Sequence, residues 1–428
     1  MRRPILRIAL LGGLLALGAA APEPPEVTHG SFEEDFQSAW REIGSMYAYF
    51  QKKATRWNDV PRLYAPDLAR VSNKGEFIDL LERVMDELYD PHAQLTVNTP
   101  ASPRLVPSGT DLWAEWRAGE AVITEVRDGS DAREAGIRPG AVVLGLNGVA
   151  IAEAAAARMG RSYPHTEAAA RDWALRAVLA GTHGSARSLL LREGEIRRTV
   201  ELPAPDQWRT RRPQPLTRSE PRPGIGCIRF NDSLGDQASV AAFDEALAAL
   251  RQSRALVVDL RDTPSGGNSS VARGVLGRFV RSEAPYQEHA LPSEERETGI
   301  ARSWLELVSP RGSFVYERPV AVLVDHWTGS MGEGLAIGFD GTGRGTVIGT
   351  PMAGLLGATY HVTLPKTGIG LNVPAERLYH VRGTPREEFR PTVAVDLTRA
   401  GSEADPILAA ALRFLAGRRE GTDLHRGI

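Results

Sequence analysis

The chain has 428 residues, of which 42% are hydrophobic and 24% charged; this is an ordinary globular composition with room for two or three domains. Its 51 basic and 53 acidic side chains give a net charge of −2, which excludes the strongly basic surface expected of a nucleic-acid-binding protein. The single cysteine, Cys227, excludes an intrachain disulfide and a zinc site built from cysteines, and we expect neither a metal nor a cofactor.

Residues 1–21 have the pattern of a cleaved signal peptide: a basic start, a short apolar run and small residues at its end. A membrane anchor is the alternative, but the run is short and interrupted by glycine. No later stretch is apolar for long enough to span a bilayer. We therefore expect a periplasmic or secreted bacterial protein that has no integral membrane span once residues 1–21 are removed.

Residues 22–103 are expected to form a small N-terminal helical domain. Apolar side chains recur every three or four positions over residues 31–52, after a capping-box pattern at Ser31. The same spacing recurs over residues 76–88 and indicates a second helix.

Residues 104–206 read as a β-rich domain. A strand is expected at 121–126, a helical insert at 165–181 and a closing strand pair within 185–202. Between the first two lies "DGSDAREAGIRPGAVVLGLNGVAI", which resembles the turn, short helix and strand of a PDZ domain. Such domains bind an extended C-terminal peptide. The resemblance implies a peptide-binding loop with Leu112 and Trp113, although Asp111 in that loop would repel a carboxylate.

Residues 207–428 alternate strands with helices, which predicts an α/β domain with a parallel or mixed sheet. The stretch 203–223, rich in proline and charge, reads as the linker before it. Strands are expected at 255–262, 319–325 and 345–350, a hairpin at 358–374, and helices at 269–280, after Ser330 and at 404–417.

Ser330 lies where the apolar strand "PVAVLVD" passes through a small-residue turn into a helix. Serine is a favoured helix N-cap, so capping alone would explain it. The same position also suits a nucleophile, because the turn exposes the hydroxyl beside the backbone N–H groups of the helix start. The N–H of Met331 would then stabilise an oxyanion, and Gly266-Gly267, after the neighbouring strand, would supply a second donor.

Together, "VVDLRDTPSGGN" and, about 60 residues later, "TGSMGEG" resemble the S41 serine peptidases, which include the C-terminal processing proteases and the tricorn-type proteases. The resemblance extends over nearly all of the chain after residue 21. It implies a multidomain α/β fold with a helical domain, a PDZ-like domain and a ClpP/crotonase-like catalytic core. It also implies Ser330 as nucleophile, within the family's S-x-x-E pattern that ends at Glu333, and the oxyanion glycine at Gly266 or Gly267.

The family uses one of two bases. One branch has a lysine about 25 residues after the serine, where this chain has Leu355, and Lys366 comes too late. The tricorn-like branch uses a histidine and a glutamate. Its motifs match "ELYDPHAQL", which gives His92 as base, and "RGTPREEFRP", which gives Glu387 as the orienting acid, with Glu388 as its rival. His326, four residues before the serine, is the alternative base.

The expected activity is that of an exported serine endopeptidase acting on a peptide or protein substrate through Ser330, His92 and Glu387. Two other readings stay open at this point. The chain could be a non-catalytic relative that binds a ligand or peptide, or an esterase that uses the same groups.

Overall fold

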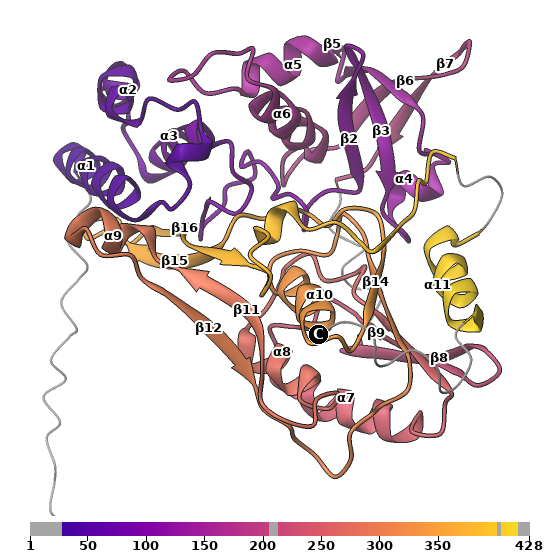
Figure 1. Ribbon diagram of the computed structural model, residues 1–428. Helices are drawn as coiled ribbons and strands as arrows, with labels where there is room; N and C mark the ends of the chain where they lie inside the picture. The colour runs from indigo at the N-terminus through magenta and orange to yellow at the C-terminus, as the bar shows by residue number, and fades with distance from the viewer. Residues whose placement is uncertain (1–27, 205–212, 400–403, 418–428) are drawn as a thin grey trace, which may run out of the picture.

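The computed structural model describes residues 28–204, 213–399 and 404–417. The expected signal peptide, residues 1–21, lies outside them. Three sheets and the helices around them give a mixed α/β architecture (Figure 1). We name these sheets the core sheet, the second sheet and the bridging sheet.

The core sheet is mixed, as expected, with strand order β17-β14-β13-β10-β9-β8. Neighbouring strands are parallel except for β8, which is antiparallel to β9. Its strands are β8 (Leu216–Arg222), β9 (Ile225–Phe230), β10 (Ala255–Asp259), β13 (Val320–Val324), β14 (Thr346–Gly349) and β17 (Val393–Ala394). β8 lies inside the stretch 203–223 that was expected to be a linker, so that expectation is wrong there. The strand lies at the edge of the sheet, where a proline and polar side chains are tolerated.

Helices cover both faces of the core sheet. On one face lie α7 (Ala238–Ala249), α8 (Ser269–Leu276) and α10 (Met331–Gly341), and on the other lies α11 (Pro406–Gly417). Every residue of β10 and β13 is therefore buried, which explains why these strands are continuous apolar runs.

The second sheet is antiparallel with the order β2-β3-β4-β6-β7. Its strands are β2 (Leu112–Arg117), β3 (Glu120–Val126), β4 (Val142–Leu146), β5 (Val149–Ala150), β6 (Arg187–Glu193) and β7 (Ile196–Leu202), and its helices are α4 (Asp131–Glu134), α5 (Ile151–Arg158) and α6 (Ala168–Ala180). α6 is the expected helical insert, whereas α5 was not expected.

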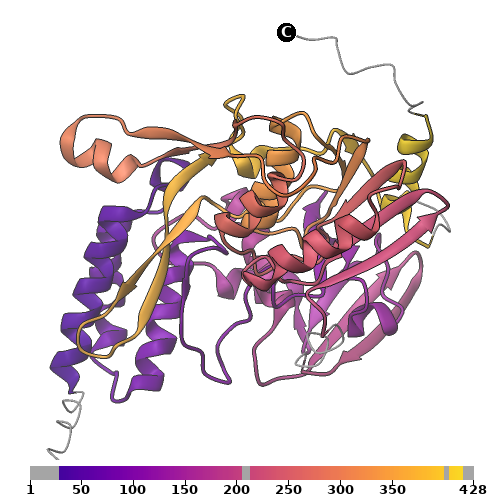
Figure 2. The ribbon, with the colours of Figure 1, turned by 90° about the horizontal axis from the view of Figure 1, so that it is seen from below.

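The N-terminal helices stand side by side (Figure 2). They are α1 (His29–Met46), α2 (Val60–Leu68) and α3 (Lys74–Met85), with the short 3-10 turns η1 (Phe50–Lys52), η2 (Trp57–Asp59) and η3 (Asp86–Leu88). The helix expected over 31–52 stops at Met46 and resumes as η1. α2 was not expected, because prolines at its start and within it weaken the sequence signal.

The bridging sheet joins these helices to the core. Its strands are β1 (Gln94–Leu95), β11 (Ala284–Ala290), β12 (Ser303–Val308), β15 (Ala358–Thr363) and β16 (Gly370–Tyr379), with α9 (Pro292–Thr298) between β11 and β12. The expected hairpin, β15–β16, lies across the helices (Figure 2), and Leu371 and Val373 of β16 belong to their apolar core. β1 pairs with β16, which places the turn after α3 next to the bridging sheet.

The second sheet is docked on the core by buried polar contacts. The Arg127 guanidinium lies 2.9 Å from the Asp262 carboxylate, and the Trp327 ring N–H donates to the Thr110 carbonyl at 2.8 Å. None of the helices within the described residues is both long and apolar enough to cross a membrane.

Candidate active site

Ser330 lies between the buried strand β13 and helix α10, as the sequence predicts, and it is also the N-cap residue of that helix. Its backbone has φ 49° and ψ −110°, in a region that residues other than glycine rarely adopt. Such strain costs about 1–3 kcal/mol and persists only where the surrounding structure enforces it. A capping serine needs no such strain, so this backbone favours the nucleophile interpretation.

Glu333 holds the turn in this conformation. Its carboxylate is fully buried and accepts backbone N–H groups from Ser330 at 2.8 Å, Gly354 at 2.9 Å and Leu355 at 3.3 Å. Burial raises the pKa of Glu333 to about 7. The carboxylate therefore ties the turn at Ser330 to the loop 353–357.

Gly266 lies against Ser330 and Gly267 against Leu234, and each position excludes a side chain. A Cβ atom at Gly266 would lie 3.0 Å from the Ser330 Oγ and 3.2 Å from the Met331 N, whereas one at Gly267 would lie 2.2 Å from the Leu234 backbone. The N–H of Gly266 is already donated to the Thr263 carbonyl.

The N–H groups of Gly267 and Met331 donate to no acceptor within the described residues. Of the two glycines, Gly267 is therefore the one whose amide is available. Because Gly266 packs on Ser330, the free amides of the adjoining residues Gly267 and Met331 are the candidate donors to an oxyanion.

His92 lies in the turn after η3, and this turn is fixed by Asp90. The Asp90 carboxylate accepts the His92 backbone N–H at 2.9 Å and the Tyr47 hydroxyl at 2.8 Å. The His92 Nδ1 lies 2.7 Å from the Leu356 carbonyl oxygen. Because a carbonyl only accepts, Nδ1 carries the proton and Nε2 keeps its lone pair. Burial is the main cause that lowers the pKa of His92, so the neutral imidazole is favoured.

Within the described residues, no hydrogen bond joins His92 to Ser330 or to Glu387. The two turns are linked instead through the loop 353–357, whose amides bond Glu333 and whose Leu356 carbonyl bonds His92. The structure therefore brings Ser330 and His92 to the same loop without a direct contact.

Leu355, which matches the lysine position of the other branch, lies beside the nucleophile turn. A Cβ atom at Gly329 would lie 3.3 Å from its Cδ1. Lys366 is instead in the turn between β15 and β16 and pairs with Glu34 at 3.0 Å.

Glu387 and Glu388 lie in the short helix η5 (Arg386–Glu388), and both contact Lys52, at 2.9 and 2.7 Å. Their exposure differs: the Glu387 side chain is 8% exposed and that of Glu388 is 58% exposed. Of the two, only Glu387 faces the interior, where its charge adds to the burial that raises the pKa of Tyr49. The structure brings Glu387 to Lys52 rather than to His92.

The alternative base, His326, is engaged elsewhere. Its Nδ1 is hydrogen-bonded to the Glu125 carboxylate of β3, and its ring stacks on Trp113 with the centroids 4.4 Å apart. His326 therefore belongs to the contact between the core and the second sheet.

Leu112 and Trp113, expected at the peptide-binding loop, do not present side chains to a ligand. Both are buried, Leu112 in the apolar core of the second sheet and Trp113 against His326. Asp111 is not a free repelling charge either, because two hydrogen bonds join it to the buried Arg187, at 2.7 and 2.9 Å. The side chains of this loop thus pack and bond within the protein, and a role of the loop in peptide binding stays a prediction.

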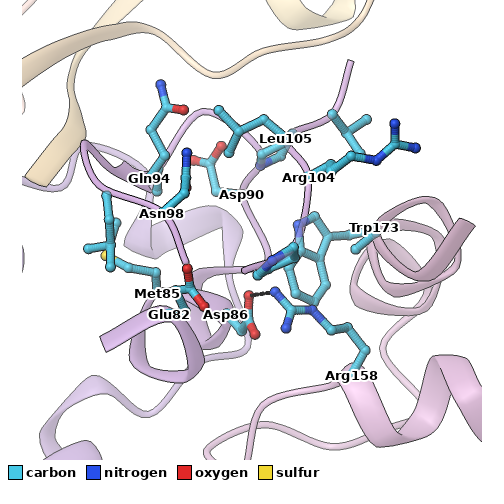
Figure 3. Close-up of a pocket in the computed structure, with 16 residues that line it drawn as sticks. Glu82, Met85, Asp86, Asp90, Gln94, Asn98, Arg104, Leu105, Arg158 and Trp173 are labelled. Atoms are coloured by element: carbon cyan, nitrogen blue, oxygen red, sulfur yellow. Dashed lines mark hydrogen bonds and ion pairs between the residues drawn. The ribbon is translucent and has the colours of Figure 1, made fainter. Parts of the chain in front are cut away.

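A cavity of about 70 Å³ lies next to the His92 turn, between the N-terminal helices and α6 (Figure 3). Pro91 and Ala93, which flank His92, line one side of it, and Leu105 and Val106 line another. A Cβ atom at Gly329 would lie 3.4 Å from the following residue, Pro107, so this wall continues to the turn that holds Ser330.

Polar groups close the end of the cavity. Arg158 of α5 lies 2.7 Å from the Asp86 carboxylate, and the Trp173 ring lies beside it (Figure 3). Burial raises the pKa of Asp86 to about 7. The ion pair therefore joins the N-terminal helices to the second sheet at the site.

Two contributors to the site were missed in the sequence. Arg386, which donates to the Leu355 and Gly357 carbonyls, lies within the glutamate motif but reads there as one more surface charge. The role of the Leu356 carbonyl is invisible because any residue supplies one. The only available signal for Arg386 was its position beside Glu387.

The comparisons with known proteins agree with this geometry. Residues 224–395 match the model of peptidase family S41, and residues 28–86 match the tricorn protease C1 domain. Among solved structures, the photosystem II D1 C-terminal processing protease has a TM-score of 0.56 at 21% identity and covers 90% of this chain and 97% of its own. Mature CPAF has a TM-score of 0.56 at 14% identity, over 86% and 94% of the two chains.

A structure of mature CPAF complexed with lactacystin also has a TM-score of 0.56 at 14% identity, over 90% and 97% of the two chains. At these identities the solved structures show a shared fold, and the family match adds the activity. Residues 224–395 match the S41 peptidase model and contain a serine at a strained turn; this chain is a serine-type peptidase.

Proposed function

We propose that the chain is an exported endopeptidase that cleaves peptide bonds by acyl transfer, with Ser330 as nucleophile and His92 as base. The observation that carries the proposal is the strained turn that holds Ser330 against Gly266, with free amides at the adjoining residues Gly267 and Met331.

The reaction has two halves. The Ser330 Oγ attacks the peptide carbonyl while its proton passes to the His92 Nε2, and the oxyanion is held by the two amides. The C–N bond then breaks, and the amine leaves with the proton from His92. A water molecule, deprotonated by His92, then attacks the acyl carbon, and the bond from that carbon to the Ser330 Oγ breaks as His92 returns the proton to Oγ. Transfer requires Nε2 within about 2.6–3.2 Å of Oγ, so the His92 turn has to close on Ser330 when substrate binds.

Glu387 is the third member of the proposed apparatus. Its carboxylate would stabilise the imidazolium that forms on His92. Because Glu387 is bonded to Lys52, it has to leave that ion pair to reach the histidine.

We also propose that the second sheet is a PDZ-like peptide-binding module. Its order of strand, turn, short helix and strand supports this, together with α6 packed along the edge strand β2. PDZ domains bind an added peptide strand between such a strand and helix.

Export rests on the sequence of residues 1–21 alone. Fractionation of cells that express the full chain would test it: recovery of the shortened protein outside the cytoplasm supports export, and retention of the full-length chain in the cytoplasm contradicts it.

The direct test of the activity is hydrolysis of an unstructured protein substrate by the wild type and by Ser330→Ala. The matched control is Ser265→Ala, since Ser265 lies on the same strand-end surface but is exposed and bonded to Asp232. We expect Ser330→Ala to abolish cleavage and Ser265→Ala to retain it within about twofold, as removing a nucleophile costs several orders of magnitude. Full activity in Ser330→Ala would overturn the proposal.

A further inference from the structure

Arg386 is a buried cation at the centre of the site. It is 1% exposed, and one of its terminal nitrogens donates to the Leu355 carbonyl at 3.1 Å and to the Gly357 carbonyl at 2.8 Å. Its nearest acid is the Glu333 carboxylate, 3.9 Å away. A buried guanidinium is costly, and this one has its hydrogen bonds directed at a single loop.

The two carbonyls that Arg386 holds flank the one that bonds His92. Glu333 holds the same loop from the other side, through the N–H groups of Gly354 and Leu355. The Glu333 carboxylate thus fixes the loop by accepting from its amides, and the Arg386 guanidinium fixes it by donating to its carbonyls. Between them, the Leu356 carbonyl is aimed at the His92 Nδ1 at 2.7 Å.

We propose that Arg386 is a positioning residue, which orients His92 through the Leu356 carbonyl. This inference rests on the proposed function, in which His92 is the base. The carbonyl fixes the proton on Nδ1 and the lone pair on Nε2, which is the part that an orienting carboxylate plays in other serine hydrolases. Arg386 keeps the carbonyl in place and touches neither the serine nor the histidine.

The charge of Arg386 gives the proposal a second consequence. Burial lowers the pKa of His92, the bond to Leu356 raises it, and the charge of Arg386 lowers it again, while Asp90 in the same turn raises it. Loss of the Arg386 charge should therefore raise the pKa of His92 and move the rising limb of activity to higher pH. The shift reports the charge of Arg386, which also lowers the pKa of Glu333, whereas the rate reports the position of the Leu356 carbonyl.

The experiment measures the rate of inactivation by a fluorophosphonate probe across about pH 5 to 9, a range that contains the ordinary imidazole pKa of about 6.5. The variants are Arg386→Met, which keeps the length of the side chain, and Arg386→Lys, which keeps the charge. The matched control is Arg382→Met, because Arg382 is 70% exposed and lies on the same segment.

We expect Arg386→Met to slow inactivation about 10- to 100-fold, the effect of a base displaced by about 1 Å, and to shift the rising limb to higher pH. Arg386→Lys should restore the position of the limb and part of the rate. The control should match the wild type. A folded Arg386→Met that keeps the wild-type rate on the plateau above the limb would overturn the inference.

Should Arg386→Met fail to fold, the wild type still tests the orientation of His92, on which the role of Arg386 depends. ¹⁵N-labelled histidine spectra, with His92 assigned by comparison with His92→Gln, report which ring nitrogen is protonated. The inference predicts the Nδ1–H form at about pH 8, where the ring is neutral. A His92 protonated on Nε2 would contradict it. This test does not depend on catalysis. If the fluorophosphonate probe does not label Ser330 in the wild type, the proposed function is refuted, but the ¹⁵N spectra still show which ring nitrogen of His92 carries the proton.

Discussion

At the scale of single residues, the site depends on groups whose local cost is compensated by their surroundings. Ser330 has a strained backbone, and the Glu333 carboxylate is buried away from solvent. His92 is also buried, and burial lowers its pKa. Unfavourable conformations and buried charges of this kind gather at functional sites because the rest of the fold can enforce them.

The strain at Ser330 predicts that a substitution which relieves it raises stability, even though activity is lost. Ser330→Gly and Ser330→Ala should both abolish acyl transfer, but only glycine relieves the positive φ. We expect Ser330→Gly to be more stable than Ser330→Ala by about 1 kcal/mol in urea unfolding, since release of the strain outweighs the lost backbone entropy. A glycine variant that is less stable than the alanine variant would show that the turn is not strained.

The two neighbouring glutamates should differ in their effect on turnover. Glu387→Gln is expected to slow hydrolysis at least about tenfold, because in the proposed mechanism its buried carboxylate stabilises the imidazolium. Glu388→Gln should stay within about twofold, as expected for an exposed side chain. Steady-state kinetics of both variants and of Lys52→Met provide the check. Equal losses in all three would mean that Glu387 acts only through its ion pair with Lys52.

At the scale of elements, the strand-to-helix turns were predictable and the contacts between distant turns were not. "PVAVLVD" and "ALVVDLRD" give continuous apolar runs that only buried parallel strands explain, so the positions of Ser330 and the glycine pair followed from the sequence.

The link from His92 to Leu356 joins positions 264 apart and uses a main-chain carbonyl, which leaves no signal in the side chains. The strand β8 was missed for a different reason: edge strands carry polar residues and proline, as linkers do.

The environment of His92 changes the expected pH dependence. A glutamate partner would raise the pKa of His92, and the sequence therefore suggests a rise in activity through about pH 6 to 7.5. In the structure, burial against the bridging sheet and the Arg386 charge lower this pKa. The neutral form is the base, so the rise should lie below the ordinary imidazole value of about 6.5. A pH–rate profile of kcat/KM provides the measurement, and a rise centred well above pH 7 would contradict the burial argument.

At the scale of the whole molecule, the site is assembled from three parts of the chain. In the proposed apparatus the N-terminal helices supply His92, and the core supplies Ser330 and Glu387. Arg158 of α5 and Trp173 of α6, which pack with the second sheet, line the cavity next to the His92 turn (Figure 3). Buried ion pairs hold the parts together, including Arg127 with Asp262 and Arg158 with Asp86.

Removal of Arg158 should make this assembly sensitive to pH. The pKa of Asp86 is already raised to about 7 by burial, and Arg158 is the cation that opposes the rise. In Arg158→Met that pKa rises further, so the charged form is disfavoured in the folded protein and stability is lost as pH rises. We expect a loss of about 3 kcal/mol at pH 8.5 and a much smaller one at pH 5.5. Urea unfolding at both pH values checks this prediction. A larger loss of stability at pH 5.5 than at pH 8.5 would contradict the raised pKa of Asp86.

The central claim, acyl transfer through Ser330, is tested most directly by trapping the acyl-enzyme. A slowly released peptide ester is mixed with the protein, the reaction is quenched in acid, and the modified peptide is identified by mass spectrometry. The account predicts one acyl group on Ser330, and no such adduct in Ser330→Ala. Hydrolysis of the ester with no adduct, or with the acyl group on another residue, would contradict it.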